Sequence, residues 1–92
     1  MTNNNALRPE DILADGEDRT IINGQLVRKG TIAAFLANIT VLENQNSTEQ
    51  QKQEALMMLK ELAPAVNIIG LHQHVVFKNA RVEQILMDAE LS

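Results

Sequence analysis

The 92-residue sequence contains no cysteine, tryptophan or tyrosine, and its only aromatic side chains are Phe35 and Phe77. Without cysteine there is no disulfide framework, no thiolate metal site and no cysteine nucleophile. The same absence fits a reducing compartment, so we expect a cytoplasmic protein. With two aromatic side chains, the hydrophobic core must be mainly aliphatic.

The chain also lacks a basic stripe and a long hydrophobic run. Residues 1–18 hold five acids and one base, whereas the remaining residues hold seven of each, so the net charge of −4 lies at one end. A neutral body without clustered Lys and Arg predicts no nucleic-acid binding.

The start of the chain has no apolar segment typical of a secretory signal. The uncharged and mainly apolar run at residues 30–42 is about 20 Å long as a helix and too short for a bilayer core of about 30 Å.

That uncharged run, GTIAAFLANITVL, is the segment around which we expect the chain to fold. Its larger apolar side chains recur at intervals of three and four residues, which places them on one face of a helix. We therefore predict a central core helix that begins at Thr31 as N-cap and ends near Glu43 or Asn44. The side chains expected to face the core are Ile32, Phe35, Leu36, Ile39 and Leu42.

A β-hairpin is predicted immediately before this helix, over residues 19–29. Asn23-Gly24 lies between two short apolar runs, and this pair readily adopts the positive φ angles of a type I′ turn. A lone hairpin is marginal in water, so we expect it to pack against the core helix.

Further helices are expected after a polar turn at residues 44–47. Ser47 or Thr48 caps the second helix, with Gln50 or Gln51 completing a capping box. Pro64 ends or kinks this helix, and residues 65–69 form a short turn that stops at Gly70. Residues 71–77, LHQHVVF, fit either a strand or a helix, and we favour a helix because most of the chain is helical. Asn79 caps the last helix, whose apolar stripe is Val82, Ile85, Leu86 and Ala89.

The predicted fold class is therefore mainly α (α+β), with an N-terminal β-hairpin followed by a small bundle of three to four helices. The whole chain, 1–92, forms one domain. Within it, we expect residues 1–5 to be frayed, residues 6–13 to form a short turn of helix, and residues 30–90 to form the helical body.

Two candidate binding sites emerge from the sequence. Arg28, Lys29, Gly30 and Thr31 precede the core helix, and the free N–H groups at a helix start attract anions such as phosphate. This is not a P-loop, which needs a second glycine before the lysine. The other reading of the segment is an ordinary polar hairpin end.

His72 and His74 form the second candidate site. In a strand, both imidazoles would project to the same side, as metal ligands must. A catalytic zinc usually has three protein ligands, and the sequence does not identify a third. Two half-exposed histidines at the boundary of an element are the simpler interpretation.

No catalytic arrangement stands out, so we expect neither an enzyme nor a cofactor. The serines are Ser47, expected in a cap, and Ser92 at the end. Met57, Met58 and Met87 lie on the predicted helices, and exposed methionines adapt to irregular partners. The leading hypothesis is a small interaction or structural module that forms a homo-oligomer or binds a protein partner.

Overall fold

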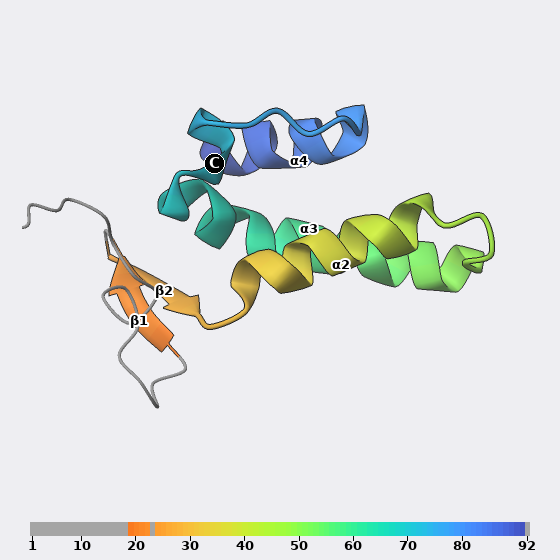
Figure 1. Ribbon diagram of the computed structural model, residues 1–92, viewed down its shortest axis with the longest axis horizontal. Helices are drawn as coiled ribbons and strands as arrows, with labels where there is room; N and C mark the ends of the chain where they lie inside the picture. Colours follow the sequence, from red (N-terminus) through yellow and green to blue (C-terminus); the bar gives the residue numbers. More distant parts are fainter. Residues whose placement is uncertain (1–18, 23, 92) are drawn as a thin grey trace, which may run out of the picture.

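The fold is described from a computed structural model, which describes residues 19–22 and 24–91 (Figure 1). The elements are β1 (Arg19–Ile22), β2 (Gln25–Arg28), α2 (Thr31–Glu43), α3 (Glu49–Ile69), the short 3₁₀ helix η1 (Leu71–Gln73) and α4 (Ala80–Leu91). The predicted class, a hairpin followed by helices, is confirmed. The frayed end, the short helical turn and the acidic segment predicted within residues 1–18 lie outside the described residues.

The hairpin pairs β1 with β2 in antiparallel register. Ile22 pairs with Gln25, so two residues form the turn, as the Asn-Gly pair predicts. Gly24 has φ +83°, a conformation that glycine adopts without steric cost. The hairpin lies at the end of the helical body where α2 begins (Figure 1).

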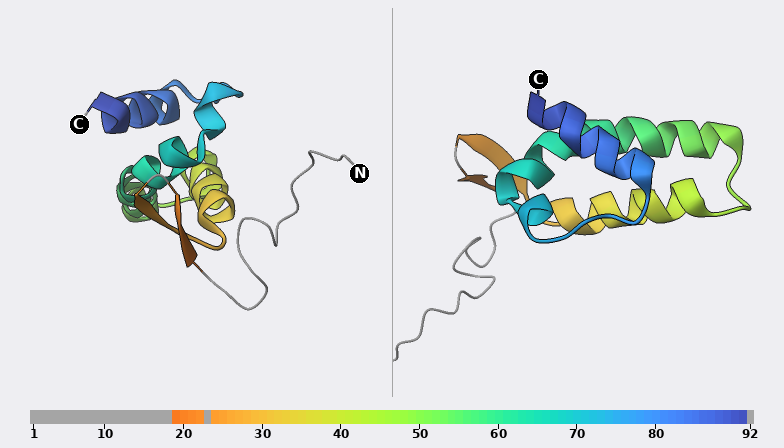
Figure 2. Two further views of the ribbon diagram at one scale, coloured as in Figure 1. Left: turned by 90° about the vertical axis from the view of Figure 1, so that its left-hand side faces the viewer. Right: turned by 90° about the horizontal axis from the view of Figure 1, so that it is seen from above.

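Helices α2 and α3 lie side by side and antiparallel, joined by the short polar turn (Figures 1 and 2). The predicted capping box is present at the start of α3. The Thr48 side chain accepts a hydrogen bond from the Gln51 N–H at 3.0 Å, and the Gln51 side chain accepts one from the Thr48 N–H at 2.8 Å. These two bonds satisfy N–H groups that have no partner within the helix.

Helix α4 crosses over one side of the α2–α3 pair and completes the core (Figure 2). Phe35 is fully buried, and its ring packs edge-to-face against Phe77 with centroids 5.7 Å apart. The stripe predicted for the last helix is confirmed, since Val82, Ile85 and Leu86 are buried. The other buried members of the core are Leu42, Leu59, Ala63 and Val66.

The start of α2 differs from the prediction. The N-cap is Gly30, at φ +83°, and it makes no side-chain capping bond. Thr31 is the first helical residue, and its hydroxyl donates a hydrogen bond to the Arg28 carbonyl at 2.6 Å. Thr31 is buried, with 7% of its surface exposed. Its hydroxyl therefore stabilises the chain reversal after β2 and does not cap the helix.

The prediction that Leu36 faces the core is wrong, because its side chain is 46% exposed. Phe35 and Leu42 are buried and Ile32 and Ile39 are partly buried against the core, as predicted. The five residues span too wide an arc of a 3.6-residue helix for one buried face. Leu36 lies at the edge of that arc.

Pro64 does not end the second helix, which runs on to Ile69. Proline cannot donate to the carbonyl of Lys60, four residues earlier, so one helical hydrogen bond is lost there. Ala63, Ala65 and Val66 are buried beside it, whereas Pro64 itself is exposed. Burial on both sides of the proline maintains the helix. Gly70, at φ +94°, then ends it as a left-handed C-cap.

Residues 71–77 form neither a strand nor a full helix. After η1 the chain has no regular structure at residues 75–77. Of the apolar side chains here, Leu71 and Phe77 pack against the core, while Val75 and Val76 are 42% and 83% exposed. Only the two ends of the segment are therefore held by burial. Both alternatives for this segment are wrong.

The neighbouring residues Phe35 and Leu36 provide a direct test of the core. Phe35→Ala should lower the free energy of unfolding by about 3–5 kcal/mol, because it empties a fully buried site. Leu36→Ala should change it by less than about 1 kcal/mol, because nearly half of that side chain is in water. Urea unfolding followed by circular dichroism measures both values, and equal losses would contradict this packing.

Candidate functional site

The four residues of the predicted anion site form the reversal between β2 and α2. Arg28, Lys29 and Gly30 are exposed, and within the described chain neither base makes an ion pair. They line a depression of about 510 Å³ between the hairpin and the two long helices. Because Gly30 provides no capping side chain, the first N–H groups of α2 lack a side-chain acceptor at the cap.

Two features of the structure oppose an anion at this place. Thr31 is buried, and its hydroxyl already donates to the Arg28 carbonyl. Glu61, from α3, lines the same depression, and its carboxylate would repel an anion. The site therefore combines two exposed bases with one acid, and the sequence pattern contains no signal for the approach of Glu61 to the hairpin.

The two predicted metal ligands lie at and just after η1. His72 Nε2 is 2.7 Å from Glu90 Oε2 of α4, and His74 is exposed in the following turn. The strand geometry that would project both imidazoles to one side is not formed. Within residues 19–22 and 24–91, no group of three His, Asp or Glu side chains is placed to hold a metal ion.

The His72–Glu90 contact links the segment after α3 to the last helix. The Nδ1 atom of His72 and the Oδ1 atom of Asn67 are buried without a hydrogen-bond partner among the described residues. The Nδ2 atom of Asn67 donates to the Leu86 carbonyl at 2.8 Å. These contacts attach α4 to α3 and η1, and they give both His72 and Asn67 a structural role.

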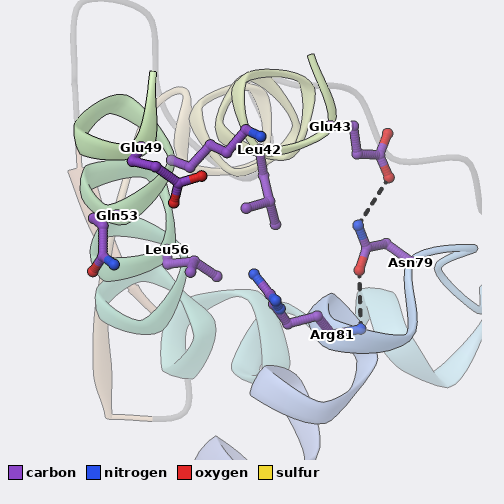
Figure 3. A pocket seen from close by; sticks show the side chains of 8 residues that line it. Leu42, Glu43, Glu49, Gln53, Leu56, Asn79 and Arg81 are labelled. Atoms are coloured by element: carbon purple, nitrogen blue, oxygen red, sulfur yellow. Dashed lines mark hydrogen bonds between the residues drawn. The ribbon is translucent and has the colours of Figure 1, made fainter. Parts of the chain in front are cut away.

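A further depression, of about 680 Å³, lies where the end of α2 and the starts of α3 and α4 meet (Figure 3). Asn79 holds this junction together. Its Oδ1 accepts from the Arg81 N–H at 2.9 Å, as the predicted cap requires, and its Nδ2 donates to Glu43 Oε2 at 3.0 Å. Two bases, Lys52 and Arg81, balance two acids, Glu43 and Glu49, so the depression favours no single sign of ligand charge.

Ser47, one of the two serines, closes the end of α2. Its Oγ donates to the Val41 carbonyl at 2.7 Å. The hydroxyl is thereby engaged with the backbone in the predicted polar turn, whereas the N-cap of α3 is Thr48 and not Ser47.

The outward side of α2 is an exposed surface without charged side chains. From Thr31 to Leu42 the helix has no charged residue, yet a large part of it is exposed. A helix at the surface of a soluble protein normally places charged and polar side chains on its outward face. Here that face carries small or apolar side chains with one threonine: Ala33, Ala34, Leu36, Ala37 and Thr40.

The three methionines of α3 and α4 have exposed side chains. Met57 and Met87 are 69% and 52% exposed, and Met58 is 39% exposed. Neither Met57 nor Met87 lines the depression between α3 and α4, which is formed by Lys60, Pro64, Ile85, Asp88 and Ala89. Met58 instead faces the other side of α3, towards α2.

None of the described helices is both long and apolar enough to cross a bilayer. No family model matches the chain, and no match was found among curated proteins or solved structures.

The anion hypothesis predicts that phosphate raises the melting temperature of the unaltered protein. Replacing both Arg28 and Lys29 by alanine should abolish that increase, because it removes the two exposed cations of the depression. Differential scanning fluorimetry with inorganic phosphate measures the effect, and Lys78→Ala is a control at an exposed lysine outside the depression. No increase in the unaltered protein would end this hypothesis.

The metal hypothesis predicts stoichiometric metal in protein purified without a tag, and its loss in His72→Ala. Elemental analysis for zinc, nickel, copper and iron decides the matter. The Glu90 carboxylate lies 2.7 Å from His72 Nε2, so a metal bound by His72 would also be bound by Glu90. Protein free of these metals removes the basis of the site.

Proposed function

We propose that the chain is a small non-catalytic interaction module, which binds protein through the exposed, uncharged side of α2. One observation carries the proposal: α2 packs beside α3 and presents Ala33, Ala34 and Ala37 to solvent, without a charge between Thr31 and Leu42. Charged residues are depleted at the centres of protein interfaces. Small side chains also allow a second helix to approach closely.

Two further features support this function. The described body is thin, since α4 covers one side of the α2–α3 pair and leaves much of α2 outward (Figure 2). Apolar side chains elsewhere are also well exposed, including Ile21 at 69% and Val76 at 83%. The absence of cysteine from the sequence supports a place in the cytoplasm.

A second candidate function is the binding of a small phosphate-like anion at Arg28, Lys29, Gly30 and Thr31. The observation that favours it is the pair of exposed bases beside the uncapped start of α2. Glu61 in the same depression makes this the weaker of the two.

The interaction function predicts that a charge on the outward side of α2 prevents partner binding. The tagged chain and its Ala37→Glu variant should be used as baits in lysate of the native organism. Proteins retained by the unaltered chain should be lost with Ala37→Glu, because a buried, unpaired carboxylate opposes association. Mass spectrometry identifies the retained proteins.

Ala80→Glu is the matched control, since it adds the same side chain at an exposed position of α4. This variant should retain the same proteins as the unaltered chain. Identical proteins on all three baits would contradict the proposed surface. The result is informative only where circular dichroism shows that both variants keep their helices.

A further inference from the structure

A depression of about 220 Å³ lies between the hairpin, the start of α2 and the end of α3 (Figure 1). Its apolar lining comes from all three of these parts of the fold: Ile22, Val27, Ile32, Ala33 and Ile69. Ile69 is 37% exposed, so the described chain leaves apolar surface uncovered here. An aliphatic side chain placed in the depression would remove that surface from water.

The rim of this depression is basic. Arg28 and Lys29 both line it, both are exposed, and neither forms an ion pair within the described chain. Glu61 lines the neighbouring depression of about 510 Å³ but not this one. The described residues around the smaller depression therefore supply two positive charges and no negative one, which favours an acidic occupant.

The acidic part of the chain joins the fold at the same place. Residues 1–18 hold five acids and one base, and they lead directly into β1. Arg19, the first residue of β1, pairs with Arg28 at the rim. Glu17 and Asp18 are joined to Arg19 by at most about 7 Å of chain, so they stay within reach of the long basic side chains.

We propose that residues 10–18 of the chain itself occupy this depression. Their aliphatic pair, Ile12 and Leu13, packs against the apolar lining. Their last two acids, Glu17 and Asp18, lie beside the two bases, where the candidate anion site would take a phosphate. The inference goes beyond the proposed function, because it concerns the hairpin end of the body and requires no second protein.

The length of the connection suits this arrangement. Leu13 precedes Arg19 by six residues, which span up to about 20 Å when extended. Asp15 and Gly16 lie between them, and this pair favours a turn that reverses the chain. Because the connection is short, docking is intramolecular, at an effective concentration on the order of millimolar. Weak ion pairs and one aliphatic contact are then sufficient to hold the segment.

Paramagnetic NMR of the full chain tests the docking. The sequence has no cysteine, so Ala14→Cys introduces a single thiol for a nitroxide spin label. The label should strongly broaden the methyl signals of Ile32 and Ile69. It should affect Leu56 far less, because Leu56 lies about 20 Å along α3 from Ile69.

Charge reversal separates docking from the simple proximity of a tethered label. Arg28→Glu combined with Lys29→Glu should restore most of the lost Ile69 signal, because like charges then face one another at the rim. Adding Glu17→Lys and Asp18→Lys to this variant restores the opposite charges. The broadening of Ile69 should then return.

Lys78→Glu combined with Arg81→Glu is the matched control, since it makes the same change of charge at two exposed bases outside the depression. This variant should leave the broadening of Ile69 unchanged. The reversal at the rim keeps the chain reversal itself, because the Thr31 hydroxyl donates to the backbone carbonyl of Arg28 and not to its side chain.

Equal broadening of Ile69 before and after the reversal of Arg28 and Lys29 would overturn the inference, because a label that only passes near the hairpin gives that result. Spin-labelled chain without isotopes, mixed with isotope-enriched chain without the spin label, should show no broadening. Broadening in this mixture would also overturn it, since the contact would come from a second copy. Neither result affects the test of the proposed function with Ala37→Glu.

Discussion

The burial of Phe35 is the constraint on which the rest of the structure depends. One of two aromatic residues in the chain, it has no exposed surface, and α2 alone cannot cover it. Leu59 and Val66 of α3 and Val82 and Leu86 of α4 share its core cluster, and Phe77 contacts its ring from the connecting segment. Covering this side chain therefore brings together three helices and one irregular segment.

The same constraint gives α2 two different sides. With no charge from Thr31 to Leu42, the sides differ mainly in the size of their side chains, with Leu36 as the exception on the exposed side. Phe35 and Leu42 are buried, whereas the alanines at 33, 34 and 37 are exposed. Burying a large apolar side chain contributes about 1.5–3 kcal/mol, and an alanine contributes much less, so this orientation is the stable one. The outward side remains uncharged, and that property supports its use as a binding surface.

Local features of the fold could be predicted from the sequence because they depend on neighbouring residues. The Asn-Gly turn, the Thr48–Gln51 capping box and the Asn79 cap each involve groups within three residues of one another. The end of α2 at Glu43 was also predicted, whereas its start lies one residue earlier than predicted, with Gly30 as the N-cap. The α3 helix continues through Pro64 because the residues on both sides of the proline are buried. A prediction from neighbouring residues alone does not include this burial.

The candidate sites were less predictable, since they depend on contacts between distant segments. His72 meets Glu90 across 18 residues, and Asn79 meets Glu43 across 36. The approach of Glu61 to Arg28 and Lys29 also depends on the antiparallel packing of α2 against α3. The alanines of α2 were visible in the sequence, but only the structure places them in solvent.

The alanines of α2 are exposed in the free chain, and the proposed function requires that a partner cover them on binding. Methyl NMR with a soluble paramagnetic agent measures this directly. At low protein concentration the methyl signals of Ala34 and Ala37 should broaden strongly, whereas those of the buried Ala55 and Ala63 should not. With a captured partner, Ala34 and Ala37 should become protected while Ala80 stays accessible. Protection of Ala34 and Ala37 at every dilution, or accessibility equal to that of Ala80 under every condition, would contradict the account.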